Sequence, residues 1–212
     1  RKDEMSEAVQ TIKSANTGIE SINTLIQAAK SLATAALSAD ASGVESLFTQ
    51  YQAVLSQIDF MSEDSGYKGV NLLAGTSTVM TVSFDELGDS FLSMSGFDAT
   101  ALTGLSLTDA DWLDTGEISR TNVEGAISAL DQAKNTLRTE SSKLSNNLAI
   151  ITARQEFTQG MINVLKDGAA GLTNADMNEE GANMLMLQTR QALGTTSLSL
   201  ASQAAQSVLR LF

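Results

Sequence analysis

Two long stretches of the chain place apolar residues at alternating spacings of three and four, a pattern typical of one stripe along an α-helix. In residues 5–37 the stripe consists of Met5, Val9, Ile12, Ile19, Ile26, Ala33 and Leu37. In residues 119–166 it consists of Val123, Ile127, Leu130, Leu137, Leu144, Leu148, Ile151, Ile162 and Leu165. At about 1.5 Å per residue the second helix would be roughly 70 Å long, so the pattern predicts a rod. We expect its stripe to form a bundle core together with Ile12, Ile19 and Ile26 of the first.

Polar residues interrupt the first stripe at Asn16, Asn23 and Lys30. A buried asparagine at such a position tends to fix the register of a coiled coil at some cost in stability. The same residues could equally lie at a hydrated margin of the stripe. Both interpretations stay open at this point.

The middle of the chain contains a predicted turn and helix, followed by a segment of different composition. Asp40, Ser42 and Gly43 form a turn and capping cluster, after which residues 44–61 are expected to form a second helix. Residues 62–116 are then rich in glycine, serine and threonine. Within them, the runs 79–84 and 91–95 have strand composition and flank a polar loop, which predicts a β-hairpin.

The end of the chain is nearly free of charge. Asp167–Gly168 and Gly171 are expected to end the long helix, and Asn174 or Asp176 to cap a last one. From Leu185 onward only Arg190 and Arg210 are charged, while apolar residues lie on more than one side of the helix. Such a helix must be covered on several sides, which favours self-association. The predicted interface is Leu185, Leu187, Leu193, Leu198, Leu200, Ala201, Ala205, Val208, Leu211 and Phe212.

Composition removes most familiar active sites. The 212 residues include no cysteine, histidine or proline, so thiolate chemistry and the commonest general base and metal ligand are absent. The formal net charge of −12 disfavours nucleic acid and anionic membranes as partners, and no stretch is long and apolar enough for a membrane span. The acidic cluster Asp109, Asp111, Asp114 and Glu117 lacks the spacing of an EF-hand and fits a solvated loop better. We therefore expect no catalytic, cofactor or metal site.

Several motifs resemble those of bacterial flagellins, notably the alphaproteobacterial ones. Near the end these are Asn178–Glu179–Glu180–Gly181–Ala182–Asn183–Met184–Leu185, Gln188–Thr189–Arg190–Gln191, Leu198–Ser199–Leu200–Ala201–Ser202–Gln203 and Ser207–Val208–Leu209–Arg210–Leu211–Phe212. Upstream, Arg154–Gln155–Glu156–Phe157 is similar to the family's long return helix, and residues 66–73 to the loop that precedes its β region.

The resemblance implies a mainly α fold, an elongated antiparallel bundle of long helices with a small β-hairpin region. It divides the chain into amino-terminal helices (1–61), a hairpin and loop region (62–117), a long return helix (118–168) and a carboxyl-terminal inner-tube helix (169–212). The family's amino-terminal helix, which would pair with the last segment, is not found in this sequence.

The implied function is that of a secreted, extracellular structural subunit of the flagellar filament, which serves motility without catalysis. The implied partners are other flagellin subunits, a secretion chaperone, and the hook-associated junction and cap proteins. The alternative is a secreted helical adhesin, hook-associated or secretion-tip protein, which would remain monomeric with its last helix folded back.

Overall fold

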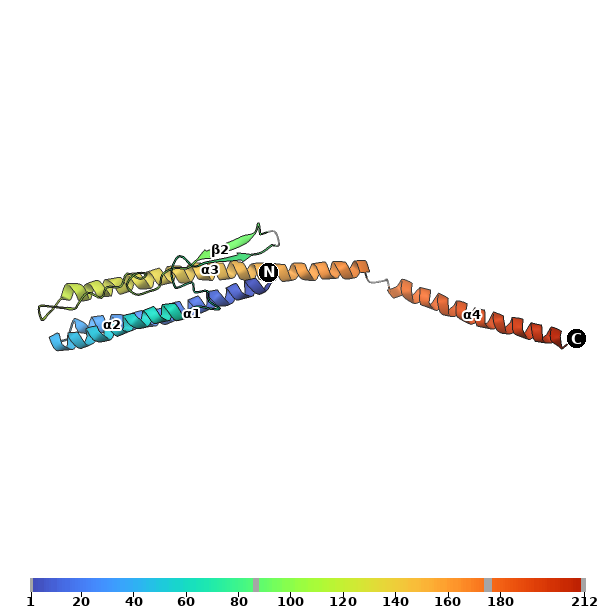
Figure 1. The fold of residues 1–212 in the computed structure, drawn as a ribbon, viewed down its shortest axis with the longest axis horizontal. Coiled ribbons are helices and arrows are strands. Elements are labelled where there is room, and N and C mark those ends of the chain that lie inside the picture. Colours follow the sequence, from blue (N-terminus) through green and yellow to red (C-terminus); the bar gives the residue numbers. More distant parts are fainter. Residues whose placement is uncertain (1, 86–87, 174–176, 211–212) are drawn as a thin grey trace. The chain divides into compact units, whose positions relative to one another are not determined.

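The computed structural model describes residues 2–85, 88–173 and 177–210 and divides the chain into two compact units, Arg1–Gln159 and Gly160–Phe212. The described elements are, in order, α1 (Lys2–Ala36), α2 (Ala41–Asp64), β1 (Val79–Ser83), β2 (Phe91–Ser95), β3 (Leu113–Asp114), β4 (Glu117–Ile118), α3 (Arg120–Thr173) and α4 (Met177–Leu209). The first unit contains α1, α2, the strands and most of α3, which run alongside one another (Figure 1). The expected mainly α fold with a small hairpin region is confirmed.

Helices α1 and α2 form a tight antiparallel hairpin. Asp40 caps α2 by accepting a hydrogen bond from the Gly43 N–H at 2.8 Å, as its capping chemistry predicts. The buried face of α1 contains both large and small residues, and the small ones let neighbouring backbones approach closely. Its small members are Ala8, Ala15, Gly18, Ala29, Ala33 and Ala36.

The loop after α2 is tied back onto that helix. The Asn71 amide donates to the carbonyl oxygens of Ser62 at 2.8 Å and Glu63 at 2.9 Å, satisfying groups that a helix end leaves unpaired. Residues Tyr67 and Val70 then exchange both backbone hydrogen bonds around a tight turn. Lys68 and Gly69 have φ angles of 49° and 83° there, a left-handed conformation suited to such turns.

Two antiparallel strand pairs follow. Strands β1 and β2 form the expected hairpin, with Val79 opposite Ser95 and Ser83 opposite Phe91. Val82 and Met94 lie on its buried face. The second pair, β3 with β4, was not predicted, because each strand has two residues.

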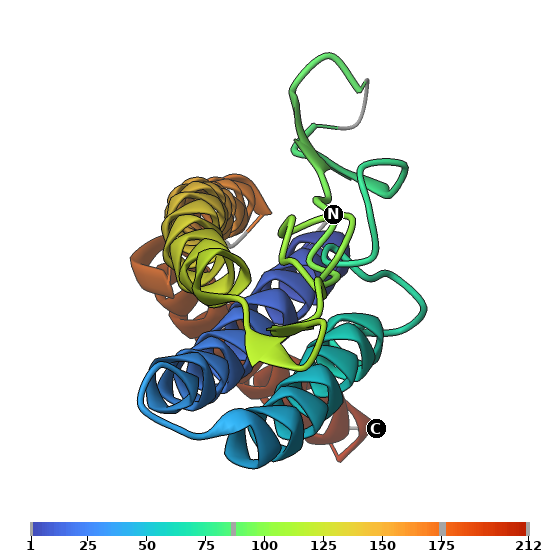
Figure 2. The same cartoon turned by 90° about the vertical axis from the view of Figure 1, so that its left-hand side faces the viewer.

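Helix α3 supplies the third wall of the first unit. Its fully or nearly fully buried residues recur at spacings of three and four and then of seven, all on one stripe: Val123, Ala126, Leu130, Ala133, Leu137, Leu144 and Ile151. Ile127 and Leu148 pack partly buried against the same core, which also contains Ile12, Ile19 and Ile26. In the end-on view of Figure 2, α2 and α3 lie on different sides of α1.

Two expectations about the end of α3 are wrong. The helix runs through Asp167–Gly168 and Gly171 to Thr173, because one glycine costs a helix only about 1 kcal/mol, which its neighbours can offset. Leu165 is 64% exposed and Ile162 only partly buried, so they are not core residues. Both belong to the second unit, where no described side chain is buried. The proposed caps Asn174 and Asp176 lie outside the described residues.

Candidate assembly surface

Helix α4 exposes its side chains on all sides. It starts with Glu179 and Glu180 in its first turn, where negative charge is favoured by the helix dipole. None of its described residues is buried. Since apolar residues do not gather on one face, packing against a single surface would leave much of the helix uncovered.

The apolar residues predicted for the interface are exposed along this helix. The exposed fractions are 68% for Leu185, 64% for Leu187, 65% for Leu193, 74% for Leu198, 62% for Leu200 and 59% for Val208. Ala201 and Ala205 are exposed between them, whereas Leu211 and Phe212 lie outside the described residues. Four more large apolar side chains of α4, not among those predicted, share this exposure: Met177, Met184, Met186 and Leu209. Their signal was present in the sequence, since the whole segment is poor in charge.

Exposed apolar surface on this scale points to a partner. Covering a leucine side chain contributes about 1.5–3 kcal/mol. The leucines of α4 could therefore supply the free energy of a stable association between helices. In the part of the chain that the structure describes, no helix is long and apolar enough to cross a membrane.

A line of polar contacts joins α1 to α3 in antiparallel register. The Lys2 ammonium donates to Gln159 at 2.7 Å, and Gln155 donates to the Ser6 hydroxyl at 2.9 Å. Farther along, the Ser141 hydroxyl donates to the Asn16 side-chain oxygen at 3.3 Å. These contacts fix which turns of the two helices face each other.

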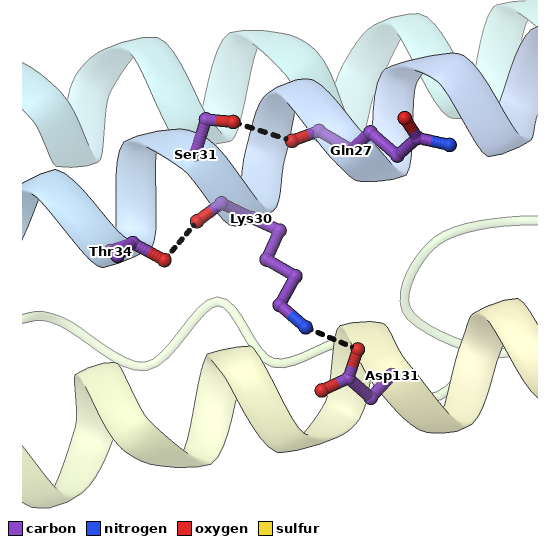
Figure 3. A network of polar contacts seen from close by, with 5 residues as sticks. All are labelled: Gln27, Lys30, Ser31, Thr34 and Asp131. Carbon is purple, nitrogen blue, oxygen red and sulfur yellow. Dashed lines mark hydrogen bonds and ion pairs between the residues drawn. The ribbon is translucent and has the colours of Figure 1, made fainter.

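Lys30 closes this line with an ion pair to Asp131 at 2.5 Å (Figure 3). On α1 itself, the Thr34 hydroxyl donates to the Lys30 carbonyl oxygen and the Ser31 hydroxyl to that of Gln27. Asn16, Asn23 and Lys30 are all partly buried. Asn16 and Lys30 thus combine the two interpretations, because they lie at a margin of the core and also link α1 to α3. Asn23 lies at the same margin, but its side-chain oxygen is buried without a hydrogen-bond partner among the described residues.

An aromatic cluster anchors the loop before α3 on α2. Trp112 and Tyr51 are fully buried, with ring centroids 4.8 Å apart, and Phe48 lies 5.3 Å from Trp112. The Tyr51 hydroxyl donates to the Thr108 carbonyl oxygen at 2.8 Å. Burial, together with the nearby charge of Asp109, raises the pKa of Tyr51 to about 12. Trp112 is therefore a packing residue of the first unit.

Acidic residues of the same region serve local structure. Asp98 accepts hydrogen bonds from the Thr100 and Thr103 hydroxyls at 2.6 and 2.9 Å. Burial acts to raise the pKa of Asp98, but these hydrogen bonds outweigh it and hold the pKa below its ordinary value. Among the described residues no group of three or more acidic side chains is placed to hold a metal ion.

Comparison with known families gives a match at the carboxyl-terminal end. Residues 121–212 match the family model for the bacterial flagellin C-terminal helical region. The matched segment contains the return helix α3 except its first residue, and the whole of the exposed helix α4.

Curated relatives extend the match to the whole chain. Flagellin FljM of Caulobacter vibrioides is 27% identical over 216 residues, which cover 100% of this chain and 76% of the relative. A flagellin of Brucella melitensis is 25% identical over 218 residues, covering 100% of this chain and 77% of the relative. Flagellin C of Rhizobium meliloti is 35% identical over 86 residues, or 41% of this chain and 27% of the relative.

A solved structure has the same fold. The crystal structure of Bacillus cereus flagellin superimposes with a TM-score of 0.62 at 20% sequence identity, covering 74% of this chain and 88% of that one. At this identity the likeness concerns the fold.

Proposed function

Because this chain belongs to the flagellins, the secreted structural subunits of the extracellular bacterial flagellar filament, we propose that α4 is the surface through which its copies pack together. The observation that carries the proposal is the exposure of apolar side chains around the whole circumference of α4. A filament surrounds each subunit with others, so it can cover such a helix on several sides at once. The role is structural and requires no catalytic group.

The proposal assigns the two units different tasks. In this proposal residues 1–117 and the return helix, predicted to span 118–168, form an outer domain whose core lies within the first unit, Arg1–Gln159. Residues 169–212 form the inner-tube helix and lie in the second unit, to which residues 160–168 at the end of the return helix also belong. The buried stripe on α3 supports the first assignment, since it is complete within the first unit. The lack of buried residues in α4 supports the second.

The proposal also includes partners other than copies of the chain. Before export, a secretion chaperone would shield Leu185 to Phe212, because an apolar helix free in the cell would aggregate. At the filament ends, hook-associated junction proteins and the cap would contact the same helix or its neighbours. Their contacts are expected to be apolar and nearly free of ion pairs, as the composition of α4 dictates.

Seeded growth on sheared filament ends tests the assembly role of α4. Leu198→Gln with Leu200→Gln removes two exposed leucines, and a version truncated before Met184 removes most of the helix. At about 1.5–3 kcal/mol for each covered leucine, we expect the double variant to raise the critical concentration at least roughly 100-fold.

The matched control is Val79→Gln, which polarises a side chain of similar exposure, 56%, in the first unit. This control should grow as the unmodified chain does. Equal growth of all four proteins would refute the role of α4, and helical content measured by circular dichroism shows whether each variant is folded.

A further inference from the structure

The seam between α1 and α3 opens into a groove with a net positive charge, since Lys134 and Arg138 outnumber the single carboxylate of Glu20. The groove has a volume of about 430 Å³ and is lined by Ile19, Glu20, Asn23, Gln27, Lys134 and Arg138, together with two polar residues of α3. Lys134 and Arg138 lie one helical turn apart and are exposed. Within the described part of the chain neither has an ion pair or hydrogen bond, whereas the nearby Lys30 is paired with Asp131. We call this feature the basic groove.

The side of the unit formed by α2 has the opposite charge. A smaller groove of about 320 Å³ is lined by Gln52, Leu55, Ser56, Asp59, Leu102 and Asp109, with no basic residue among them. Leu102 is 47% exposed there, and the neighbouring Phe60 is 55% exposed. We call this feature, an apolar side chain flanked by two carboxylates, the acidic edge.

The two features lie at the same level along the helices. The Ser14 hydroxyl donates to the Ser65 carbonyl oxygen at 3.0 Å, which sets the register of the antiparallel α1–α2 pair. Both helices rise by the same distance per residue, so stepping away from that contact places residues 20–27 of α1 beside residues 52–59 of α2. These are the segments that line the basic groove and the acidic edge, and α3 and α2 lie on different sides of α1 (Figure 2).

We propose that in the filament the basic groove of one copy receives the acidic edge of a neighbouring copy, an inference that rests on the proposed assembly function. Moving one copy sideways brings its acidic edge to the basic groove of the next copy. Because the two surfaces that meet are different, the contact is heterologous and can repeat from copy to copy. Lys134 and Arg138 meet Asp59 and Asp109, and Leu102 enters a groove whose wall includes the apolar Ile19. In a chain with a net charge of −12, such a pairing also selects one relative orientation among mutually repelling copies.

Charge reversal on each face tests the contact. The first variant carries Lys134→Glu and Arg138→Glu, and the second carries Gln52→Lys and Asp109→Lys. Asp59 is left intact because it accepts a hydrogen bond from the Ala101 N–H at 2.7 Å. The first variant has two acidic faces and the second two basic ones, so each should repel itself while the two should alternate with one another.

Sedimentation of seeded, full-chain protein measures the outcome. We expect each variant alone to need a critical concentration roughly tenfold or more above that of the unmodified chain, and the equimolar mixture to recover most of that loss. The control Lys13→Glu with Arg120→Glu makes the same change of net charge as the first variant, at exposed positions outside both features, and should assemble normally.

Normal assembly of both variants alone, or no recovery in the mixture, would overturn the contact and leave the role of α4 intact. If the unmodified chain itself does not join the seeds, the assembly function fails, and this contact fails with it.

Discussion

Ionisation of Tyr51 should destabilise the first unit in alkali. The side chain is fully buried, and its pKa rises from 10.0 to about 12. A pKa that is higher in the folded than in the unfolded state contributes stability that is complete below pH 10 and is lost as the pH rises through 12. Two pKa units correspond to about 3 kcal/mol of unfolding free energy.

Tyr51→Phe isolates this contribution. The variant cannot ionise at that position, but it leaves the Thr108 carbonyl oxygen without the hydroxyl that donates to it at 2.8 Å. Near pH 8 it should therefore be less stable by about 1 kcal/mol. Near pH 12 it should be more stable than the unmodified protein by about 1 kcal/mol, since ionisation of Tyr51 has by then cost the unmodified protein about 2 kcal/mol, more than the missing hydrogen bond costs the variant. The two stability curves must cross between those pH values.

Urea unfolding at pH 8 to 12, followed by the fluorescence of Trp112, gives both curves. Trp112 is the chain's one tryptophan and lies 4.8 Å from the Tyr51 ring. Tyr67→Phe, at the chain's other tyrosine, serves as the matched control for losing one phenol. If the unmodified protein and Tyr51→Phe lost equal stability between pH 9 and 12, folding would not raise the pKa of Tyr51, and this reasoning would be refuted.

Three further predictions concern stability. Leu137→Ala should cost about 2–5 kcal/mol in urea unfolding, whereas Leu165→Ala should stay within about 0.5 kcal/mol, because the first side chain is fully buried and the second is 64% exposed; equal costs would contradict this. Gly104→Ala would place a Cβ against the Asp98 carbonyl oxygen and should cost about 1–3 kcal/mol, whereas Gly125→Ala adds a Cβ on α3 that has open space around it and should stabilise by about 0.5–1 kcal/mol. A higher thermal midpoint for Gly104→Ala than for Gly125→Ala would contradict this prediction. Asp98→Asn should reduce the loss of stability as the pH falls below 4, because the pKa of Asp98 is lowered in the folded state; an unchanged acid limb of the pH–stability curve would rule this out.

Periodic patterns predicted the long helices well because a buried face must repeat with the helical turn. Ile12, Val123 and Leu137 could be assigned to a core from spacing alone. The same reasoning failed at Leu165, since a stripe indicates which residues share a face and leaves open whether anything covers that face. It also placed a break at Gly168, where neighbouring helix-forming residues keep α3 continuous.

Local turns and non-local pairing were harder to predict. The β3–β4 pair depends on a two-residue turn in which Thr115 and Gly116 have φ angles of 52° and 85°. Threonine rarely adopts that conformation, so its sequence signal is weak. The basic groove was missed for another reason: Lys134 and Arg138 lie far along the chain from the α1 residues across the seam, and only the antiparallel register brings them together.

Hydrogen exchange of α4, before and after assembly, tests the central claim most directly. Amides of Met177–Leu209 should exchange within roughly the time of an isolated helix in the free subunit, because no side chain there is buried. In filaments the same amides should become at least as protected as those of the core stretch of α3 around Leu137. Equal, fast exchange of α4 in both states would show that assembly does not cover it, and would contradict the account.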